Sequence, residues 1–319
     1  MLKSILYYQG RAKCYLDQCK LTKTPEITCH ESSQARYQPL VLHWVLSDNL
    51  RNETERIFEV WGLKDVTLKT YEYEGYARVN SIPTSHHSGW SAMLKLFATE
   101  ILEESIQQVI TLDTDIIFGE NINKLWEIFD EFDGNQAIGA ACEQSNQCIS
   151  DCFLDGNQFP KSGANTGVLL LKLNILRILN WDELWRYAMN SVIQQTGELL
   201  NADQSVTNMA LSNNSEMYYK LPCEWNVQLL SNDGMDCCPT CWIDREPEKV
   251  DCLLEKYIGC QMARAIHYNV PNKIELTEQG EELNDENSRV DHMESSNCFA
   301  YFLRYEVIED NLLFLWHEI

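Results

Sequence analysis

Short apolar runs alternate along this chain with segments whose apolar residues repeat at helical spacing. The runs, rich in β-branched residues, predict buried strands at 39–46, 66–71, 109–118, 136–142 and 165–171. The helically spaced segments predict helices near 54–61, 90–102, 122–132, 180–194 and 203–213, and residues 2–8 resemble the end of another helix. This alternation predicts a Rossmann-like α/β fold, in which a mostly parallel central sheet is flanked by helices.

The remaining segments do not break the chain into parts. Residues 9–38 are polar and indicate an irregular insertion that disulfides could tie, and the acidic stretch 275–297 indicates a loop. The apolar tail 298–319 predicts a C-terminal helix that docks on the domain. Since 319 residues can build one large domain and no linker or repeat is visible, we expect a single domain over 1–319.

Two of the predicted helices contain informative polar residues. Asn180 and Glu183 have the spacing of a capping box, with Asn180 as the N-cap of the 180–194 helix. Lys95 lies among apolar residues of the 90–102 helix, where a lysine usually extends its amine to solvent.

An acidic pair, Asp113 and Asp115, interrupts the apolar run 109–118. In an extended segment these side chains point the same way, and two like charges beside a buried strand are costly without a cation between them. Ligands also bind at the carboxyl ends of strands in open α/β sheets. The pair therefore indicates a divalent metal that carries a diphosphate, although in so acidic a chain a solvated turn is an equally simple explanation.

The charge balance limits the partners of the chain. Its 25 Lys and Arg against 48 Asp and Glu give a net charge of −23, which argues against nucleic acid or an anionic membrane surface. The 13 cysteines, with sequons at Asn52 and Asn213, favour an oxidising secretory compartment. The sequence contains neither a signal peptide nor an apolar run long enough to span a bilayer, so we expect the targeting or anchoring segment to lie outside it.

A cluster of cysteines lies late in the chain, at Cys237, Cys238, Cys241, Cys252 and Cys260. It allows a zinc site, but it lacks a second C-x-x-C pair and a histidine at finger spacing, so disulfides are the preferred interpretation.

The order of several polar motifs is more specific than any one of them. Lys95 is followed by Asp113-Thr114-Asp115, Asn165-Thr166-Gly167, Ala202-Asp203-Gln204 and the run from His267 to Lys273. In this order the chain resembles family 8 glycosyltransferases of the GT-A fold, most closely the xylosyltransferase domains of the LARGE group. The likeness also includes 221–228 and Asp310 to Leu313, and covers nearly the whole chain apart from 9–38 and 275–297.

The resemblance assigns a role to each matching residue. It implies that Asp113, Asp115 and His267 bind Mn²⁺, and that Asp113 also touches the donor. The residues that it places around the donor are Lys95, Asn165, Gly167 and Lys273. It places Asp203 and Gln204 beside the anomeric carbon of the transferred sugar, as the catalytic residues. On its own, Asp203 could equally be a carboxylate that favours a helix N-terminus.

The resemblance implies transfer of a sugar, xylose from UDP-xylose being favoured, to a glucuronic-acid-ended glycan of a glycoprotein in the Golgi lumen. A bound metal would neutralise the charge that develops on UDP, and a lysine would assist. Carboxylates, one imidazole and phosphate oxygens suit octahedral Mn²⁺ better than tetrahedral zinc. Gln204 is a poor nucleophile, which favours direct front-face transfer with retained configuration over a covalent intermediate.

The chain also departs from the family pattern. Family 8 enzymes open with a strand ahead of the helix that 2–8 resembles, so we expect that first strand, and one wall of the nucleotide pocket, to be absent. Val270 replaces a frequent glycine, and Ser205 replaces the second acid of D-Q-D. These departures leave open a scaffold or glycan-associated domain that has lost nucleotide binding. A galactosyl- or glucosyltransferase of the same family is a further alternative, as is a module built on the cysteine cluster.

Overall fold

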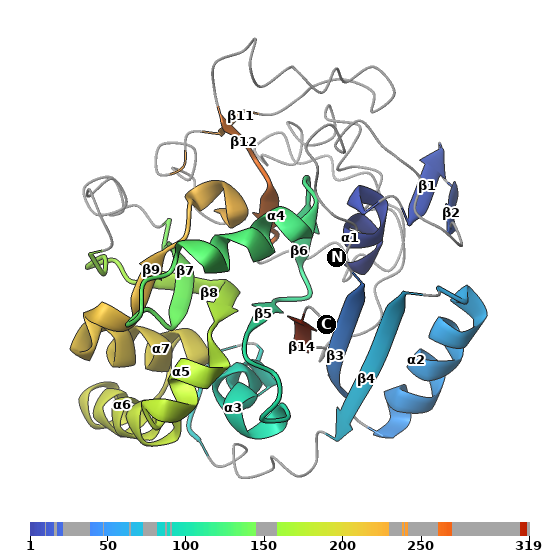
Figure 1. The fold of residues 1–319 in the computed structure, drawn as a ribbon. Helices are drawn as coiled ribbons and strands as arrows, with labels where there is room; N and C mark the ends of the chain where they lie inside the picture. The colour runs from blue at the N-terminus through green and yellow to red at the C-terminus, as the bar shows by residue number, and fades with distance from the viewer. Residues whose placement is uncertain are drawn as a thin grey trace, which may run out of the picture.

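The core of the protein is a seven-stranded sheet with helices on both faces (Figure 1). The computed structural model describes residues 1–9, 11–15, 18–21, 39–46, 48–63, 65–72, 82–86, 88–89, 91–144, 158–229, 238, 240–241, 261–269 and 313–317. The strands, in spatial order, are β4 (Val66–Glu72), β3 (Leu40–Leu46), β14 (Leu313–His317), β5 (Val109–Leu112), β8 (Ala164–Leu171), β7 (Ile138–Cys142) and β9 (Tyr218–Lys220).

Five of these strands share one direction. β3 pairs with β4 and β7 pairs with β9 in parallel, while β14 lies antiparallel between β3 and β5, and β8 lies antiparallel between β5 and β7. β3, β4, β5, β7 and β9 therefore run one way, and β8 and β14 run the other. The predicted α/β fold is confirmed, but the sheet is mixed: β3–β4 and β7–β9 are parallel pairs, and the other neighbouring strands are antiparallel because β8 and β14 run against the rest.

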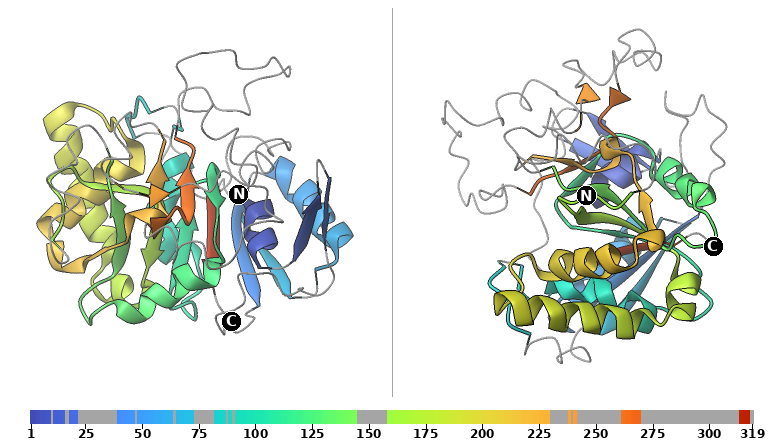
Figure 2. Two further views of the ribbon diagram at one scale, coloured as in Figure 1. Left: turned by 90° about the horizontal axis from the view of Figure 1, so that it is seen from above. Right: turned by 90° about the vertical axis from the view of Figure 1, so that its left-hand side faces the viewer.

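The helices form two groups, one on each face of the sheet. One group, with 3₁₀-helix η3 (Ser91–Phe97), comprises α3 (Ala98–Ile101), α5 (Leu173–Ile178), α6 (Trp181–Thr196) and α7 (Ala202–Asn213). The other comprises α1 (Leu2–Tyr8), α2 (Asp48–Trp61), α4 (Ile122–Glu127) and η4 (Ile128–Glu131). The turned views show the sheet between these groups (Figure 2).

The core follows from the alternation of side chains along the buried strands. In β3, the even-numbered residues from Leu40 to Leu46 join the core on the α1 face, while Val45 joins the core on the α6 face. In β8, Val168 and Leu170 face one core and Leu169 and Leu171 the other. A strand that is buried on both faces has a nearly continuous run of apolar residues, which is why these strands could be predicted from the sequence.

Smaller sheets surround this core. β10 (Val227–Gln228), β13 (Ala265–His267) and β6 (Ile116–Phe118) form a three-stranded sheet, β11 (Thr240–Cys241) pairs with β12 (Gln261–Met262), and β1 (Ala12–Tyr15) pairs with β2 (Gln18–Leu21). The short 3₁₀ turns η6 (Ser215–Met217) and η7 (Cys223–Trp225) flank β9.

The described part of the predicted C-terminal helix is a strand. Within 298–319 the structure describes β14, whose backbone pairs with β3 from Leu313↔Val45 to His317↔Val41. A short apolar run fits a buried strand as well as a buried helix, and its neighbours decide between them. β14 occupies an inner position of the sheet, between β3 and β5.

Asn180 is not the N-cap of a capping box. It has a left-handed backbone (φ 55°, ψ 56°), and its side chain makes no capping hydrogen bond to α6. The reason is that α5 ends at Ile178, only two residues earlier, and the Asn180 N–H donates to the carbonyl of Arg177. Asn180 thus closes α5, a position that favours left-handed Gly or Asn.

Two more predictions are revised. The expected helix 90–102 is η3 followed by the single turn of α3, and the insertion 9–38, expected to be irregular, contains the β1–β2 hairpin. Residues 22–38 of that insertion, the 275–297 loop, Val270 and Lys273 lie outside the described residues.

Three of the described cysteines are in disulfides. Cys223 is bonded to Cys238, and Cys142 is also disulfide-bonded. The preference for disulfides over zinc is therefore confirmed for Cys238, whose sulfur cannot then act as a thiolate ligand. Among the residues described, none of the helices combines the length and apolar character needed to cross a bilayer.

Candidate active site

The acidic pair lies in a turn between two strands of different sheets. β5 ends at Leu112 and β6 begins at Ile116, so the predicted continuous strand 109–118 is broken at 113–115. The N–H of Asp113 donates to the carbonyl of Gly167 in β8, and the carbonyl of Asp115 accepts from Tyr268, which follows β13. These two bonds join the turn to the strands that carry the other site residues.

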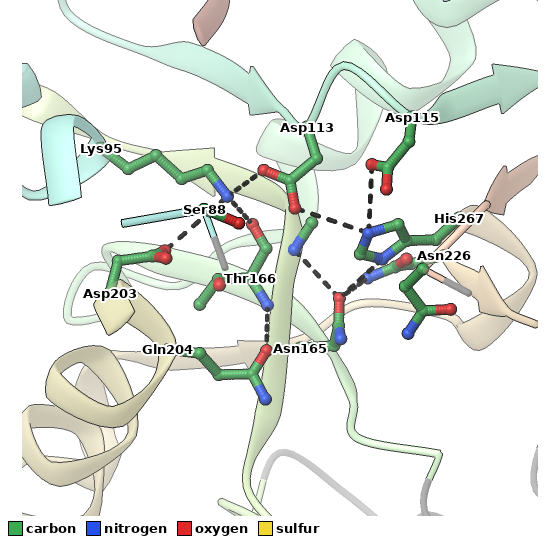
Figure 3. Close-up of polar contacts among 12 residues, drawn as sticks. Ser88, Lys95, Asp113, Asp115, Asn165, Thr166, Asp203, Gln204, Asn226 and His267 are labelled. Carbon is green, nitrogen blue, oxygen red and sulfur yellow. Dashed lines mark hydrogen bonds and ion pairs between the residues drawn. The ribbon is translucent and has the colours of Figure 1, made fainter. Parts of the chain in front are cut away.

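His267 completes a group of three potential metal ligands with this pair. β13 lies beside β6 with His267 opposite Ile116, which brings the ring over the turn (Figure 3). Its Nε2 is 3.3 Å from an oxygen of Asp115 and 3.5 Å from one of Asp113. Burial alone would lower the pKa of His267, but the carboxylates of Asp115 and Asp113 outweigh it and raise the pKa. The predicted convergence of the three residues is therefore found.

Asn165 determines which ring nitrogen of His267 faces this group. Its Oδ1 accepts from the N–H of Gly167 at 3.0 Å, so this atom must be the oxygen of the amide. The same oxygen lies 3.1 Å from Nδ1 of His267, and Nδ1 must therefore carry the proton. In the neutral ring, Nε2 is then left with a free lone pair toward the two carboxylates, the arrangement that metal-binding histidines usually have.

Gly167 lies against the ring of His267. A Cβ at this position would overlap Cε1 and Nδ1 of the imidazole. Glycine within a strand often marks a close approach of this kind. Its predicted part in a sugar pocket stays a prediction.

Lys95 is buried beside the acidic pair instead of extending to solvent. Its Nζ lies 2.5 Å from Oδ1 of Asp113, 3.7 Å from Oδ2 of Asp203 and 2.8 Å from the carbonyl oxygen of Thr166. Burial by itself would lower the pKa of Lys95, but the surrounding carboxylates raise it. The cation thus remains charged and compensates the acids (Figure 3).

Asp203 lies in the first turn of α7 and points toward Lys95. Burial raises the pKa of its carboxyl to about 6, opposed by Lys95 and assisted by Asp113. Both the helix N-terminus and the lysine favour its negative form, so the two interpretations of this residue are compatible.

Glu143, which sequence reasoning missed, connects two predicted site residues. One oxygen, Oε2, accepts from Nε2 of Gln204 at 2.8 Å and from Nδ2 of Asn165 at 3.1 Å. Oε1 of Gln204 accepts in turn from the N–H of Thr166. Glu143 directly follows β7, as Asp113 follows β5, and a carboxylate just after a buried strand was the signal that could have found it.

These residues fit a divalent metal. Asp113, Asp115 and His267 each offer a ligand atom, and these atoms lie within 4.8 Å of one another. Two carboxylates and an oriented imidazole leave positions for further oxygen ligands, as a hard or borderline cation requires.

Comparisons with known proteins show the family of the chain. The profile of the family described as Glycosyl transferase family 8 matches residues 32–274, well over half of the chain. The chain belongs to glycosyltransferase family 8. The resemblance drawn from the motifs is thus confirmed, and Lys95, the acidic pair, Asn165, Asp203 and His267 all lie inside the family match.

Individual members of the family are also similar to this chain in sequence. The chain is 28% identical over 274 residues to the xylosyl- and glucuronyltransferase LARGE2s of Gallus gallus, covering 85% of this chain and 33% of that protein. It is 30% identical over 244 residues to LARGE2 of Mus musculus, covering 76% and 33%. The chain therefore spans about a third of the length of these family 8 relatives.

A solved structure supports the fold. The apo form of mouse xyloside xylosyltransferase 1 superposes with a TM-score of 0.51 at 20% identity, covering 72% of this chain and 84% of that one. At this identity the likeness is evidence for the fold alone.

Proposed function

We propose that this family 8 chain is a divalent-metal-dependent transferase that moves a sugar from a nucleoside diphosphate sugar donor to a glycan. The observation that carries the proposal is the convergence of Asp113, Asp115 and His267 from two sheets, with Lys95 buried beside them. When bound, a divalent cation would supply the positive charge that a departing diphosphate needs. Mn²⁺ is the proposed ion, because the donor set combines carboxylates with one imidazole.

The chain's own residues would bind and orient the donor. Lys95 holds a positive charge beside Asp113, and Lys273 is proposed to contact the diphosphate. Asp203 and Gln204 would lie beside the transferred sugar, with Gln204 held by Glu143 and by the backbone of Thr166. An amide held in this way can orient a sugar hydroxyl or shield positive charge at the anomeric carbon, but it is a weak nucleophile. We therefore infer front-face transfer with retention.

The favoured donor and acceptor come from the relatives. Those proteins are named xylosyl- and glucuronyltransferases, so we propose UDP-xylose as donor and a glucuronic-acid-ended glycan of a glycoprotein as acceptor, in the Golgi lumen. The disulfides Cys223–Cys238 and at Cys142 support an oxidising compartment.

One calorimetric experiment tests the proposal. Binding of UDP and UDP-xylose is measured with and without Mn²⁺ on the chain, on Asp115→Ala and on Glu59→Ala, which removes an exposed acid of α2. We expect Mn²⁺-dependent binding to both ligands, loss in Asp115→Ala and no change in Glu59→Ala. UDP binding that is the same with and without Mn²⁺, or no UDP binding at all, would contradict a metal-dependent transferase. Either result would favour a scaffold domain that has lost nucleotide binding.

A further inference from the structure

The segment Cys223–Gln228, called here the 223–228 segment, lies beside the strand that carries His267. Its β10 part pairs with β13, and the Cα partners include Gln228 and His267 themselves. The N–H of Arg264 donates to the carbonyl of Glu224, and the guanidinium of Arg264 lies over the ring of Trp225. The segment therefore borders the whole of β13, opposite to β6.

A disulfide anchors the beginning of this segment in a small apolar cluster. Cys238 is fully buried and packs with Val227, Ile266 and Tyr268, and its partner Cys223 packs against the same cluster. Ile266 and Tyr268 are the two neighbours of His267 in the sequence. The disulfide thus fixes the segment to the residues on either side of the imidazole.

A side chain of the segment also reaches the imidazole's own hydrogen-bond partner. Nδ2 of Asn226 donates to Oδ1 of Asn165 at 2.9 Å, the oxygen that accepts from Nδ1 of His267 (Figure 3). Asn226 is fully buried, and its Oδ1 has no hydrogen-bond partner within the part of the chain that the structure describes. An unsatisfied buried carbonyl costs stability, and the hydrogen bond from the Nδ2 end of Asn226 to Asn165 offsets part of that cost.

The far end of the segment is fixed by a reciprocal pair of amides. The N–H of Gln144 donates to Oε1 of Gln228 at 3.0 Å, and the N–H of Gln228 donates to Oε1 of Gln144 at 2.9 Å. Both side chains are buried. Since Gln144 follows Glu143, the segment is attached to the end of the central sheet beside the site.

We propose that the 223–228 segment, anchored by the Cys223–Cys238 disulfide, is a positioning element for the metal ligand His267. In this proposal Asn226 fixes the side chain of Asn165 and, through it, the orientation of the imidazole. This inference rests on the metal site of the proposed function. It assigns no contact with substrate to Asn226 or to the disulfide. Partners that orient a metal-binding histidine usually contribute about 10- to 100-fold to metal affinity, and we expect a loss of that size when the segment is released.

The test measures metal affinity on the full chain. Mn²⁺ binding is followed by the loss of the electron paramagnetic resonance signal of the free ion, for the wild type, Asn226→Asp, and Cys223→Ser with Cys238→Ser. Asn226→Asp keeps the shape of the side chain but replaces its donor by an oxygen that faces Asn165. Gln136→Ala is the matched control, because Gln136 is also a buried amide, bonded to the N–H of Asp133 away from the site. His267→Ala defines loss of the ligand.

A second readout separates positioning from stability. The visible absorption of bound Co²⁺ reports its ligands, so the Asn226→Asp spectrum should shift toward that of His267→Ala, while circular dichroism shows each variant to be folded. Gln136→Ala should lose stability without a change in the Co²⁺ spectrum.

The outcomes distinguish this inference from the proposed function. Mn²⁺ binding about 10- to 100-fold weaker in both the Asn226 and the double serine variant supports it. Wild-type affinity in both overturns it and leaves the metal site intact, while a wild type that binds no Mn²⁺ overturns both. Should the double serine variant fail to fold, Asn226→Asp alone decides.

Discussion

At the scale of single residues, Gly167 sets the tightest fit in the site. We expect Gly167→Ala to displace the ring of His267, because the added methyl overlaps it, and to weaken Mn²⁺ binding at least about tenfold. Gly134→Ala is the control, since its methyl would meet nothing within 4 Å. Equal Mn²⁺ affinities in a calorimetric titration of the two variants would contradict the close approach.

Asp203 should make the stability of the folded protein depend on pH. Its folded pKa of about 6 exceeds the ordinary 3.8, so the folded protein holds a proton that the unfolded chain has already released. This contribution to stability is complete below about pH 4 and is lost as the pH rises through about 6.

Asp203→Asn should remove that dependence. From pH 4 to pH 7 the free energy of unfolding of the wild type should fall relative to the variant by about 2–3 kcal/mol, at ~1.4 kcal/mol for each unit of pKa. Urea unfolding at several pH values measures the difference. Two parallel curves would show that Asp203 does not titrate in this range.

The residues of the site differ in how far they were predictable. The acidic pair and His267 were found because their order along the chain matches a family, although the argument from strand alternation fails, since 113–115 is a turn. The sequence could not show that Lys95 is buried, because this depends on the distant Asp203 and Thr166. Glu143 had no motif and was missed.

At the scale of elements, the junction between α5 and α6 shows how neighbours override a local signal. A capping box requires an extended N-cap, but Asn180 is left-handed because it must first end α5. Strands buried on both faces, such as β3 and β8, were predictable from their continuous apolar runs. β14 was not, because its identity as a strand depends on pairing with β3 and β5.

Substitutions at Asn180 test this correction. Asn180→Gly should keep or slightly raise the free energy of unfolding, whereas Asn180→Thr should lower it by about 1–2 kcal/mol, because a β-branched side chain is disfavoured in the left-handed region that asparagine tolerates. Glu183→Ala should stay within about 0.5 kcal/mol. Thermal unfolding measures all three. A threonine variant as stable as the wild type, or a large loss of stability in Glu183→Ala, would support the capping box instead.

At the scale of the whole molecule, the net charge of −23 attracts cations non-specifically, and this attraction contributes to every measurement of metal binding. Added salt should raise the unfolding temperature modestly, because it screens repulsion among the acids. Mn²⁺ at 100 times its dissociation constant should add about 2.7 kcal/mol beyond NaCl of equal ionic strength.

This excess should vanish in Asp115→Ala, while the effect of NaCl should be kept. Differential scanning calorimetry of the two proteins in both salts makes the comparison. If Mn²⁺ stabilises Asp115→Ala as strongly as the wild type, the ion acts on the general charge of the surface and not at the triad.

The place of β14 bears on how the chain matures on the ribosome. β3 and β5, its neighbours on both sides, emerge early, but β14 is the last strand along the described chain. Until it is synthesised, each exposes an unpaired edge on which a foreign strand can add. We therefore expect nascent chains to depend on chaperones until β14 has emerged from the ribosome, and a premature stop codon before Leu313 to yield an aggregating product instead of a smaller working domain.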